Sequence, residues 1–417
     1  MVSISFIFLL GSYLMGFSFF TYFCIIADPD ESRLAHLFTV KIPEQLSSKL
    51  TKMVGPEVTN YISDAFEYTL VFFYLIVVGG SWAIIFTIVY PWIDASSNVS
   101  NYHKYLGVFV FALCFQSWRF ASGKSPGIIT AHTIPKYDNY PYDNVFYVEG
   151  KICPTVGIPK LPRSKFDRYS GVHIARFDHF CGWLHNPIGE ENYRWFLLFL
   201  AIHFGMCLYG FVIIAYLFLG EIKENNLWQV TFFNTATNTE IKADYWIIFQ
   251  FLFQRHQLIS SAFVLMGAMV VTLGLFLAYH CWIASRGMTT NETVKWSELK
   301  KWHKQETKRF KEAVKAGIVT PDGEIINKPQ IIDGDVTCSG GTTSSKAEKK
   351  EKEQPIMNPG PMPMNIYNFG LVTNWMDILY PRSLRQSSLQ RYRLSQQGRT
   401  EAQDSISVTA LTKPKTS

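Results

Sequence analysis

Three side chains suited to thioester chemistry lie within four consecutive residues of this chain: Asp178, His179 and Cys181. A cysteine attacks as its thiolate, and a neighbouring imidazole can take the thiol proton. A carboxylate beside the imidazole fixes its tautomer and stabilises its charge. The three residue types therefore indicate covalent catalysis, with Cys181 as nucleophile, His179 as base and Asp178 orienting the base. On spacing alone, ordinary loop residues would give the same pattern.

The place of Cys181 along the chain suggests the kind of substrate. Cys181 lies 14 residues before an uncharged run that begins near Trp195. We therefore expect its sulfur at a membrane interface, where the reactive end of a lipid chain rests. The combination indicates acyl transfer from a lipid-like donor through a thioester.

The composition of the chain supports a membrane setting. Of the 417 residues, 48% are hydrophobic and only 17% are charged, whereas about a quarter are charged in a typical soluble domain. These values exclude a disordered chain, a coiled coil and a nucleic-acid-binding protein with a basic face. The net charge of +6 is too small to imply a polyanionic partner. The seven cysteines are too scattered for a disulfide framework or a CxxC metal site.

Uncharged runs long enough to cross a bilayer occur at roughly 4–26, 68–93, 195–220 and 257–285. Each exceeds the about 20 residues that a helix needs to cross about 30 Å of hydrocarbon. The run 105–118 is shorter. It fits a span that extends to about 123 with Arg119 snorkelling, or a re-entrant segment, and we expect a span.

Charge and short apolar segments indicate how the spans are arranged. The basic excess of residues 122–194 places that segment in the cytosol. Five spans would put the N-terminus on the far side, and four would return both termini to the cytosol. Residues 245–254 are too short to span and predict an interfacial helix before the last span. Apolar residues at helical spacing within 28–66 predict a short helix on the membrane surface.

The chain after residue 286 is predicted to be cytosolic. A helix that contains Trp296, Leu299 and Trp302 comes first. Residues 335–355 have the composition of a flexible linker, and residues 384–417 look disordered.

The segment from Cys153 to Tyr193 resembles, without a gap, the cytosolic domain of the DHHC-type protein S-acyltransferases, or palmitoyltransferases. Three flanking motifs agree with the resemblance: Ser125-Pro126-Gly127, Thr289-Thr290-Asn291-Glu292, and the aromatic-rich segment 365–380 with Asn374. The stretches 126–130 and 289–292 are most similar to the subgroup numbered four in the human series. The resemblance covers about residues 1–382.

This resemblance implies an all-α multi-pass membrane protein, with four or five transmembrane helices and a small irregular cytosolic domain. The expected domains are transmembrane helices with their connecting loop at 1–121, the DHHC-like domain at 122–194, a helix pair at 195–286 and a cytosolic tail at 287–417. The tail carries the C-terminal motif at 365–380 and a disordered end.

The resemblance also implies a two-step reaction. Cys181 takes a fatty acyl group from acyl-CoA, with His179 as base and Asp178 orienting it, and passes the group to a cysteine of a protein substrate near the membrane. Thr290 would hydrogen-bond Asp178, and Asn374 would hold the C-terminal segment beneath the site. Thr289, Thr290, Glu292 and Asn374 are the expected structural motif residues.

The main departure from the family lies at its zinc ligands. The family binds two zinc ions through eight Cys and His side chains. The matching positions here are Cys153, Val156, Phe166, Asp167, Ser170, His173, Phe180 and Pro187. A structural zinc site needs four closed ligands, so we expect no zinc and no other bound cofactor. Since structural zinc contributes on the order of 10 kcal/mol to folding, the domain must be held by the membrane helices, the C-terminal segment or another protein.

The loss of these ligands leaves a second hypothesis open, a catalytically inactive scaffold that is a structural subunit of a larger membrane complex. Under both hypotheses the chain is embedded in membrane lipid, and we expect no nucleic-acid partner. An endomembrane, ER or Golgi, is favoured, with the mitochondrial inner membrane as the alternative.

Overall fold

The computed structural model describes residues 33–411 apart from 38–40, 235–237 and 321–356. The predicted span 4–26 and the predicted linker 335–355 lie outside the described residues. The choice between four and five spans therefore stays a prediction.

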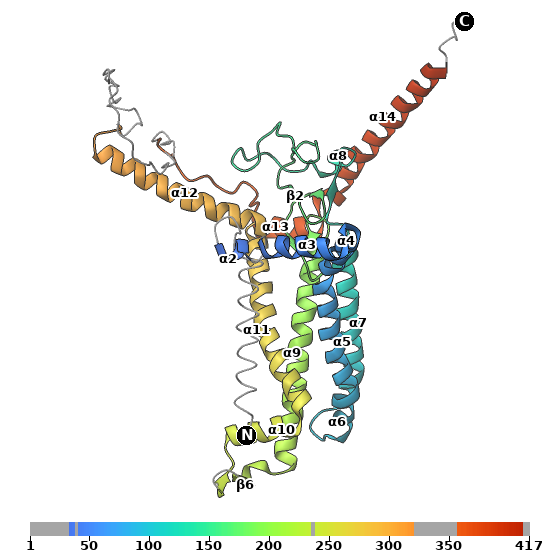
Figure 1. Cartoon of the computed structure of the whole chain (residues 1–417), viewed down its shortest axis with the longest axis vertical. Helices are drawn as coiled ribbons and strands as arrows, with labels where there is room; N and C mark the ends of the chain where they lie inside the picture. Colours follow the sequence, from blue (N-terminus) through green and yellow to red (C-terminus); the bar gives the residue numbers. More distant parts are fainter. Residues whose placement is uncertain (1–32, 38–40, 235–237, 321–356, 412–417) are drawn as a thin grey trace.

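Four long apolar helical segments stand side by side as a bundle (Figure 1). By length and composition each is able to cross a membrane: Thr69–Ala95, Tyr102–Gly123, Tyr193–Glu224 and Gln257–Ser285. The first consists of α5 (Thr69–Ile84), the π-helical turn η3 (Ile85–Val89) and α6 (Tyr90–Ala95), and the others are α7, α9 and α11 in that order. The multi-pass helical fold is confirmed, and the ambiguous run 105–118 lies within a helix of spanning length.

The bundle is packed by apolar side chains around α9. One cluster joins Val89, Ile213, Leu217, Ile259 and Met266. A second lies at the end of the bundle nearest the domain, where α9 packs beneath it. Since lipid is as apolar as these side chains, close fit rather than exclusion of water stabilises such contacts.

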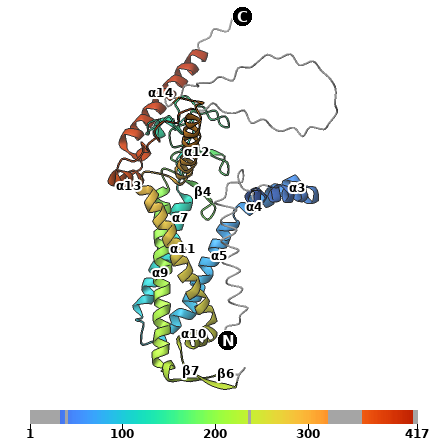
Figure 2. The ribbon, with the colours of Figure 1, turned by 90° about the vertical axis from the view of Figure 1, so that its left-hand side faces the viewer.

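The predicted surface helix is two helices, α3 (Ile42–Val54) and α4 (Pro56–Glu67), preceded by the short α2 (Arg33–His36). Gly55 breaks the run with a φ of 87°, and Pro56 begins the next helix. Both helices lie across the end of the bundle nearest the domain (Figures 1 and 2).

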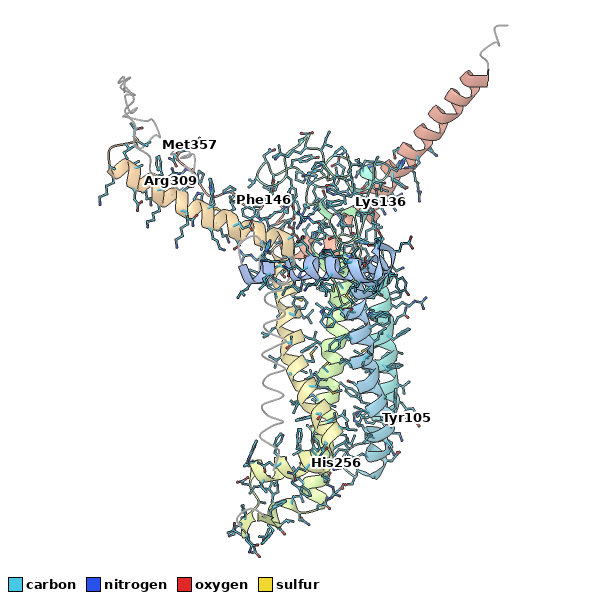
Figure 3. The ribbon with its side chains drawn as sticks, in the orientation of Figure 1. Tyr105, Lys136, Phe146, His256, Arg309 and Met357 are labelled. Carbon is cyan, nitrogen blue, oxygen red and sulfur yellow. The ribbon has the colours of Figure 1, made fainter. Side chains whose placement is uncertain are left out.

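At the opposite end of the bundle, α9 continues into the turn η4 (Leu227–Gln229) and the hairpin β6 (Thr231–Asn234)–β7 (Thr239–Lys242). The predicted interfacial helix is α10 (Tyr245–Arg255), which packs Ile248 and Leu252 against Leu227. Figure 3 places His256, just after α10, far from Phe146 and Lys136 of the domain.

The domain of residues 122–194 is small and irregular. Its antiparallel sheet has the order β1 (Ile128–Ile129), β3 (Val172–Ile174), β2 (Lys165–Asp167), and a separate hairpin joins β4 (His179–Cys181) to β5 (Asn186–Ile188). The short helix α8 (Ile134–Tyr137) packs against the sheet through Tyr137 and Ile129.

The tail consists of α12 (Thr290–Lys315), α13 (Leu371–Leu379), the turn η5 (Arg382–Leu384) and α14 (Gln386–Leu411). The prediction of disorder from residue 384 is wrong for the described part of this segment. The buried Ser388 donates to Asn139 Oδ1 at 2.7 Å, and Arg391 also donates to Asn139. These contacts fix the start of α14 beside α8 (Figure 1).

Candidate active site

The hairpin β4–β5 carries the predicted nucleophile and its neighbours. Successive strand residues point to opposite faces, so His179 and Cys181 share one face of β4 and Phe180 lies on the other. Cys181 pairs with Asn186 across the hairpin, and His179 pairs with Ile188. Cys181 is buried, with 7% of its surface exposed.

Asp178 sits at the start of this hairpin and is fully buried. Its carboxylate accepts hydrogen bonds from the Thr290 backbone N–H at 2.7 Å and from the Thr290 hydroxyl at 2.8 Å. It lies 2.7 Å from His179 Nδ1. The hydrogen bond predicted from Thr290 to Asp178 is therefore present, and the N-terminus of α12 adds a favourable dipole to the carboxylate.

The surroundings of the pair shift both pKa values. Burial opposes ionisation of Asp178, but the hydrogen bond and charge of His179, together with the Thr290 N–H, lower its pKa to about 2. Burial likewise opposes protonation of His179, but hydrogen bonds to Asp178 and Cys181 raise its pKa to about 10. Since Nδ1 faces Asp178, Nε2 is the nitrogen left for Cys181. At neutral pH the imidazole is therefore protonated and able to donate a proton.

A second residue of the hairpin ties Cys181 to the membrane boundary. Asn186, its partner across the strands, donates from Nδ2 to the carbonyls of Ala121, Ser122 and Lys124, at 2.9 to 3.2 Å. These carbonyls end α7, whose last turns otherwise leave them unpaired. The sulfur is therefore held at the domain-facing end of a candidate span.

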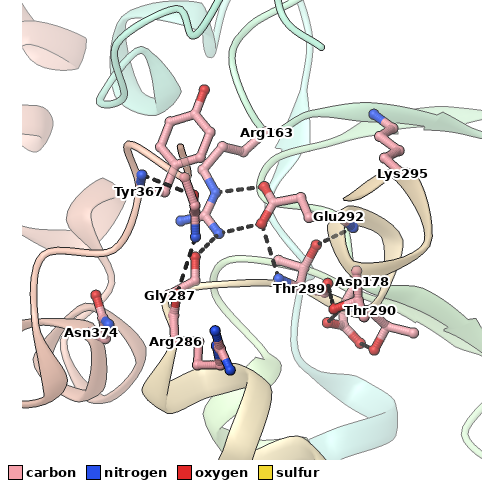
Figure 4. Close-up of polar contacts among 12 residues, drawn as sticks. Arg163, Asp178, Arg286, Gly287, Thr289, Thr290, Glu292, Lys295, Tyr367 and Asn374 are labelled. Carbon is pink, nitrogen blue, oxygen red and sulfur yellow. Dashed lines mark hydrogen bonds and ion pairs between the residues drawn. The ribbon is translucent and has the colours of Figure 1, made fainter. Parts of the chain in front are cut away.

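The predicted motif residues Thr289 and Glu292 shape the start of α12. Thr289 Oγ1 accepts from the Glu292 N–H at 3.2 Å, and Glu292 Oε2 accepts from the Thr289 N–H at 3.0 Å, a capping box. Glu292 also forms a two-pronged ion pair with Arg163, at 2.7 and 2.6 Å (Figure 4). Both side chains are at most 3% exposed, so the pair locks α12 to the domain beside Asp178.

Asn374 of α13 bridges the tail to the end of α11. Its Nδ2 donates to the Ser285 carbonyl at 3.0 Å and to Asn368 Oδ1 at 2.8 Å, and its Oδ1 accepts from the Phe369 N–H. Gly287 has a φ of 65° and allows the tail to approach the end of α11 closely. A Cβ at this position would lie 2.3 Å from the Tyr367 carbonyl oxygen. The tail is held beneath the domain as expected.

Several residues near the site were not assigned to it from the sequence. Arg163 is one, and Phe196, whose ring meets His179 edge-on at 5.1 Å, is another. His280 Nδ1 lies 3.0 Å from the Tyr193 hydroxyl, and the ring centre of His280 is 5.9 Å from that of His179. No sequence spacing indicates these contacts, because they join residues from distant elements.

The donor set does not fit the zinc sites that the resemblance implies. Among the described residues, no group of three or more His, Cys, Asp or Glu side chains is placed to hold a metal ion. Asp167 instead accepts from Ser170, through N–H and hydroxyl, at 2.9 and 2.6 Å. His173 is 2% exposed, and burial lowers its pKa to about 4. Val156 is 38% exposed and contributes little burial.

Comparison with known proteins gives consistent matches. The family model described as DHHC palmitoyltransferase matches residues 147–297. A protein of Yarrowia lipolytica named palmitoyltransferase SWF1 is 28% identical over 204 residues, 48% of this chain and 50% of that protein. The mouse protein named palmitoyltransferase ZDHHC4 is 29% identical over 185 residues, 43% and 52% of the two chains. The bovine protein of the same name is 26% identical over 269 residues, 63% and 75% of the two.

Proposed function

The chain carries a DHHC palmitoyltransferase domain over residues 147–297, and we propose that it is a membrane-embedded protein S-acyltransferase. The matching part of the chain spans about half the length of the SWF1 and mouse ZDHHC4 relatives, so the activity of the whole protein is part of the proposal. The observation that carries it is the contact of Cys181 with an imidazole oriented by a buried carboxylate, at the end of a candidate span.

The first step forms an acyl-enzyme. The Cys181 sulfur attacks the thioester carbonyl of a long-chain acyl-CoA, the bond from the acyl carbon to the CoA sulfur breaks, and CoA leaves as a thiol. The proton that CoA takes is the one on His179, which Asp178 holds in place. Acyl-CoA is thus a co-substrate and not a bound cofactor.

The second step transfers the acyl group to a protein. A substrate cysteine gives its proton to His179 and attacks the Cys181 thioester, which releases the Cys181 sulfur and leaves a new thioester on the substrate. Because Cys181 is held at the end of α7, the substrate cysteine must also lie near the membrane surface.

We favour an endomembrane, ER or Golgi, over the mitochondrial inner membrane, and imaging of the tagged full chain tests this.

A labelled long-chain acyl-CoA tests the reaction directly. The purified full chain should take up label that hydroxylamine removes, and Cys181→Ser should take up none. His179→Gln should reduce labelling about 100-fold or more, because the proton donor and acceptor is lost. An unlabelled wild-type chain, or equal label in Cys181→Ser, would overturn the proposal in favour of the inactive scaffold. Co-purification with a membrane complex in a fixed stoichiometry would further support the scaffold.

A further inference from the structure

Most residues at the positions that match the family's zinc ligands are paired with one another. Phe166 lies opposite His173 in the pair β2–β3, and Phe180 lies opposite Pro187 in the hairpin β4–β5. Asp167 and Ser170 share two hydrogen bonds across the turn between β2 and β3. Six of the eight positions thus form three pairs that need no ion.

The pair Phe180–Pro187 occupies the back of the hairpin that carries the nucleophile. Cys181 and His179 point from the front of β4, so Phe180 points away from them. The back of the hairpin is therefore where support can be added without touching the acyl donor. A two-stranded hairpin with three residues in each strand is at best marginally stable by itself, so such support is needed.

Aromatic rings extend this support to the first described span. Tyr169 stacks on Phe180 with ring centres 4.8 Å apart, and Phe180 meets His185 edge-on at 5.9 Å. The ring centre of His185 in turn lies 4.0 Å from that of Tyr68, the residue that precedes α5. The rings of Tyr169, Phe180, His185 and Tyr68, here called the aromatic clamp, thus run from the domain to the membrane bundle.

Two further contacts join α5 to the same turn of the hairpin. A methyl group of Leu70 covers Gly182, where a Cβ would lie 2.7 Å from it, and Phe73 contacts Trp183 with ring centres 6.2 Å apart. His185 has a φ of 44°, a left-handed conformation that a non-glycine residue keeps only where its surroundings enforce it. The ring of Tyr68 against His185 provides that constraint.

We propose that the aromatic clamp takes the part that metal plays in relatives and fixes Cys181 against His179. The inference rests on the proposed function for its catalytic consequence. Asn186 holds the hairpin to α7 from one side, and the clamp holds it to α5 from the other. Phe180 and Tyr68 are then positioning residues that never touch the acyl group.

Kinetics of thioester formation test the catalytic consequence. Phe180→Ala and Tyr68→Ala should lower kcat by about ten- to a hundredfold, since a misplacement of about 1 Å has effects of this size, and leave the KM for acyl-CoA within about twofold. Phe180→Tyr and Tyr68→Phe keep the rings and should restore kcat. Tyr61→Ala, at a residue of α4 that is 77% exposed, is the matched control and should behave as wild type.

Amide hydrogen exchange of residues 178–188 tests the clamp without any need for activity. Exchange in this segment should accelerate in Phe180→Ala and Tyr68→Ala, but not in Tyr61→Ala, and a strong zinc chelator should leave the wild type unchanged. If the wild type forms no thioester but exchange follows this pattern, the proposed function fails and the clamp stands. The clamp is overturned if residues 178–188 exchange at the wild-type rate in both clamp variants, or if the chelator accelerates their exchange in the wild type.

Discussion

At the scale of single residues, the buried carboxylate of Asp178 links the catalytic hairpin to the tail. It receives two hydrogen bonds from Thr290, which begins α12, and faces His179 on β4. Any movement of α12 relative to the domain would therefore change the orientation of the imidazole. The ion pair between Arg163 and Glu292, at the same end of α12, opposes that movement.

The Asp178–His179 pair should make stability depend on pH. The pKa of His179 is raised from 6.5 to about 10, so its contribution is full below about pH 6.5 and is lost as the pH rises through about 10. The pKa of Asp178 is lowered from 3.8 to about 2, so its contribution is present above about pH 4 and is lost as the pH falls through about 2. The difference in Tm between wild type and Asp178→Asn should be largest between about pH 4 and 6.5. A difference that stays constant up to pH 10 would contradict this assignment.

Breaking the Arg163–Glu292 pair should strongly destabilise the chain. Arg163→Met leaves the Glu292 carboxylate, 2% exposed, without its partner. The loss of one member of a buried pair costs about 3–5 kcal/mol, which denaturant unfolding of the purified chain measures. Glu312→Gln on the same helix removes the exposed contact with Lys308 and should have no measurable effect. Equal stability of Arg163→Met and Glu312→Gln would show that the pair adds nothing.

Residue types with a known chemistry could be recognised from sequence, and their supports could not. Asp178, His179 and Cys181 are neighbours in the chain, so their contact follows from local geometry. Arg163 and Glu292 are 129 positions apart, and only the folded chain brings them together. Tyr68 and His185 are similarly distant, which explains why the sequence showed the loss of zinc ligands but not what replaces them.

At the scale of elements, the lengths of the uncharged runs predicted the described spans well, and composition predicted the C-terminal segment poorly. The spans are uncharged over more than a helix needs to cross a bilayer, so few alternatives exist. Residues 384–417 are polar and rich in Ser, Gln and Arg, a composition typical of disorder. Ser388 and Arg391 dock the start of α14 on Asn139, a tertiary contact of the kind that overrides local preference.

Helices α3 and α4 should lie on the cytosolic surface of the bilayer, apolar side down. Leu46, Met53 and Val58 are among their exposed apolar side chains, and the two helices extend sideways from the end of the bundle (Figure 2). Because residues 42–67 contain more acidic than basic residues, apolar burial rather than attraction to anionic lipid must drive this contact.

A fluorescent label at Met53→Cys tests the orientation of α3. Brominated lipid chains should quench it, and salt should not change the quenching. Ser48 lies on the opposite face of the same helix by its spacing, so a label at Ser48→Cys should be quenched much less. Equal quenching at both positions would mean that α3 does not lie flat on the bilayer.

At the scale of the whole molecule, the four candidate spans separate two sets of connecting segments. The domain, α3, α4 and α12 gather at one end of the bundle, and α10 with the hairpin β6–β7 gathers at the other (Figures 1 and 2). All of the predicted catalytic and motif residues belong to the first end. The basic excess of residues 122–194 predicts that this end faces the cytosol.

Labelling in sealed vesicles from cells tests this sidedness. Lys151 of the domain and Glu240 of β7 are both exposed and lie at opposite ends of the bundle. In vesicles with the cytosolic face outward, a membrane-impermeant maleimide should label Lys151→Cys at once and Glu240→Cys only after permeabilisation, with the labelled peptide identified by mass. Since α9 and α11 connect the two ends through apolar helices of 32 and 29 residues, the two labels cannot share a side if both helices cross. Immediate labelling of both positions would show that the two ends of the bundle lie on the same side of the bilayer, which would contradict this arrangement of spans.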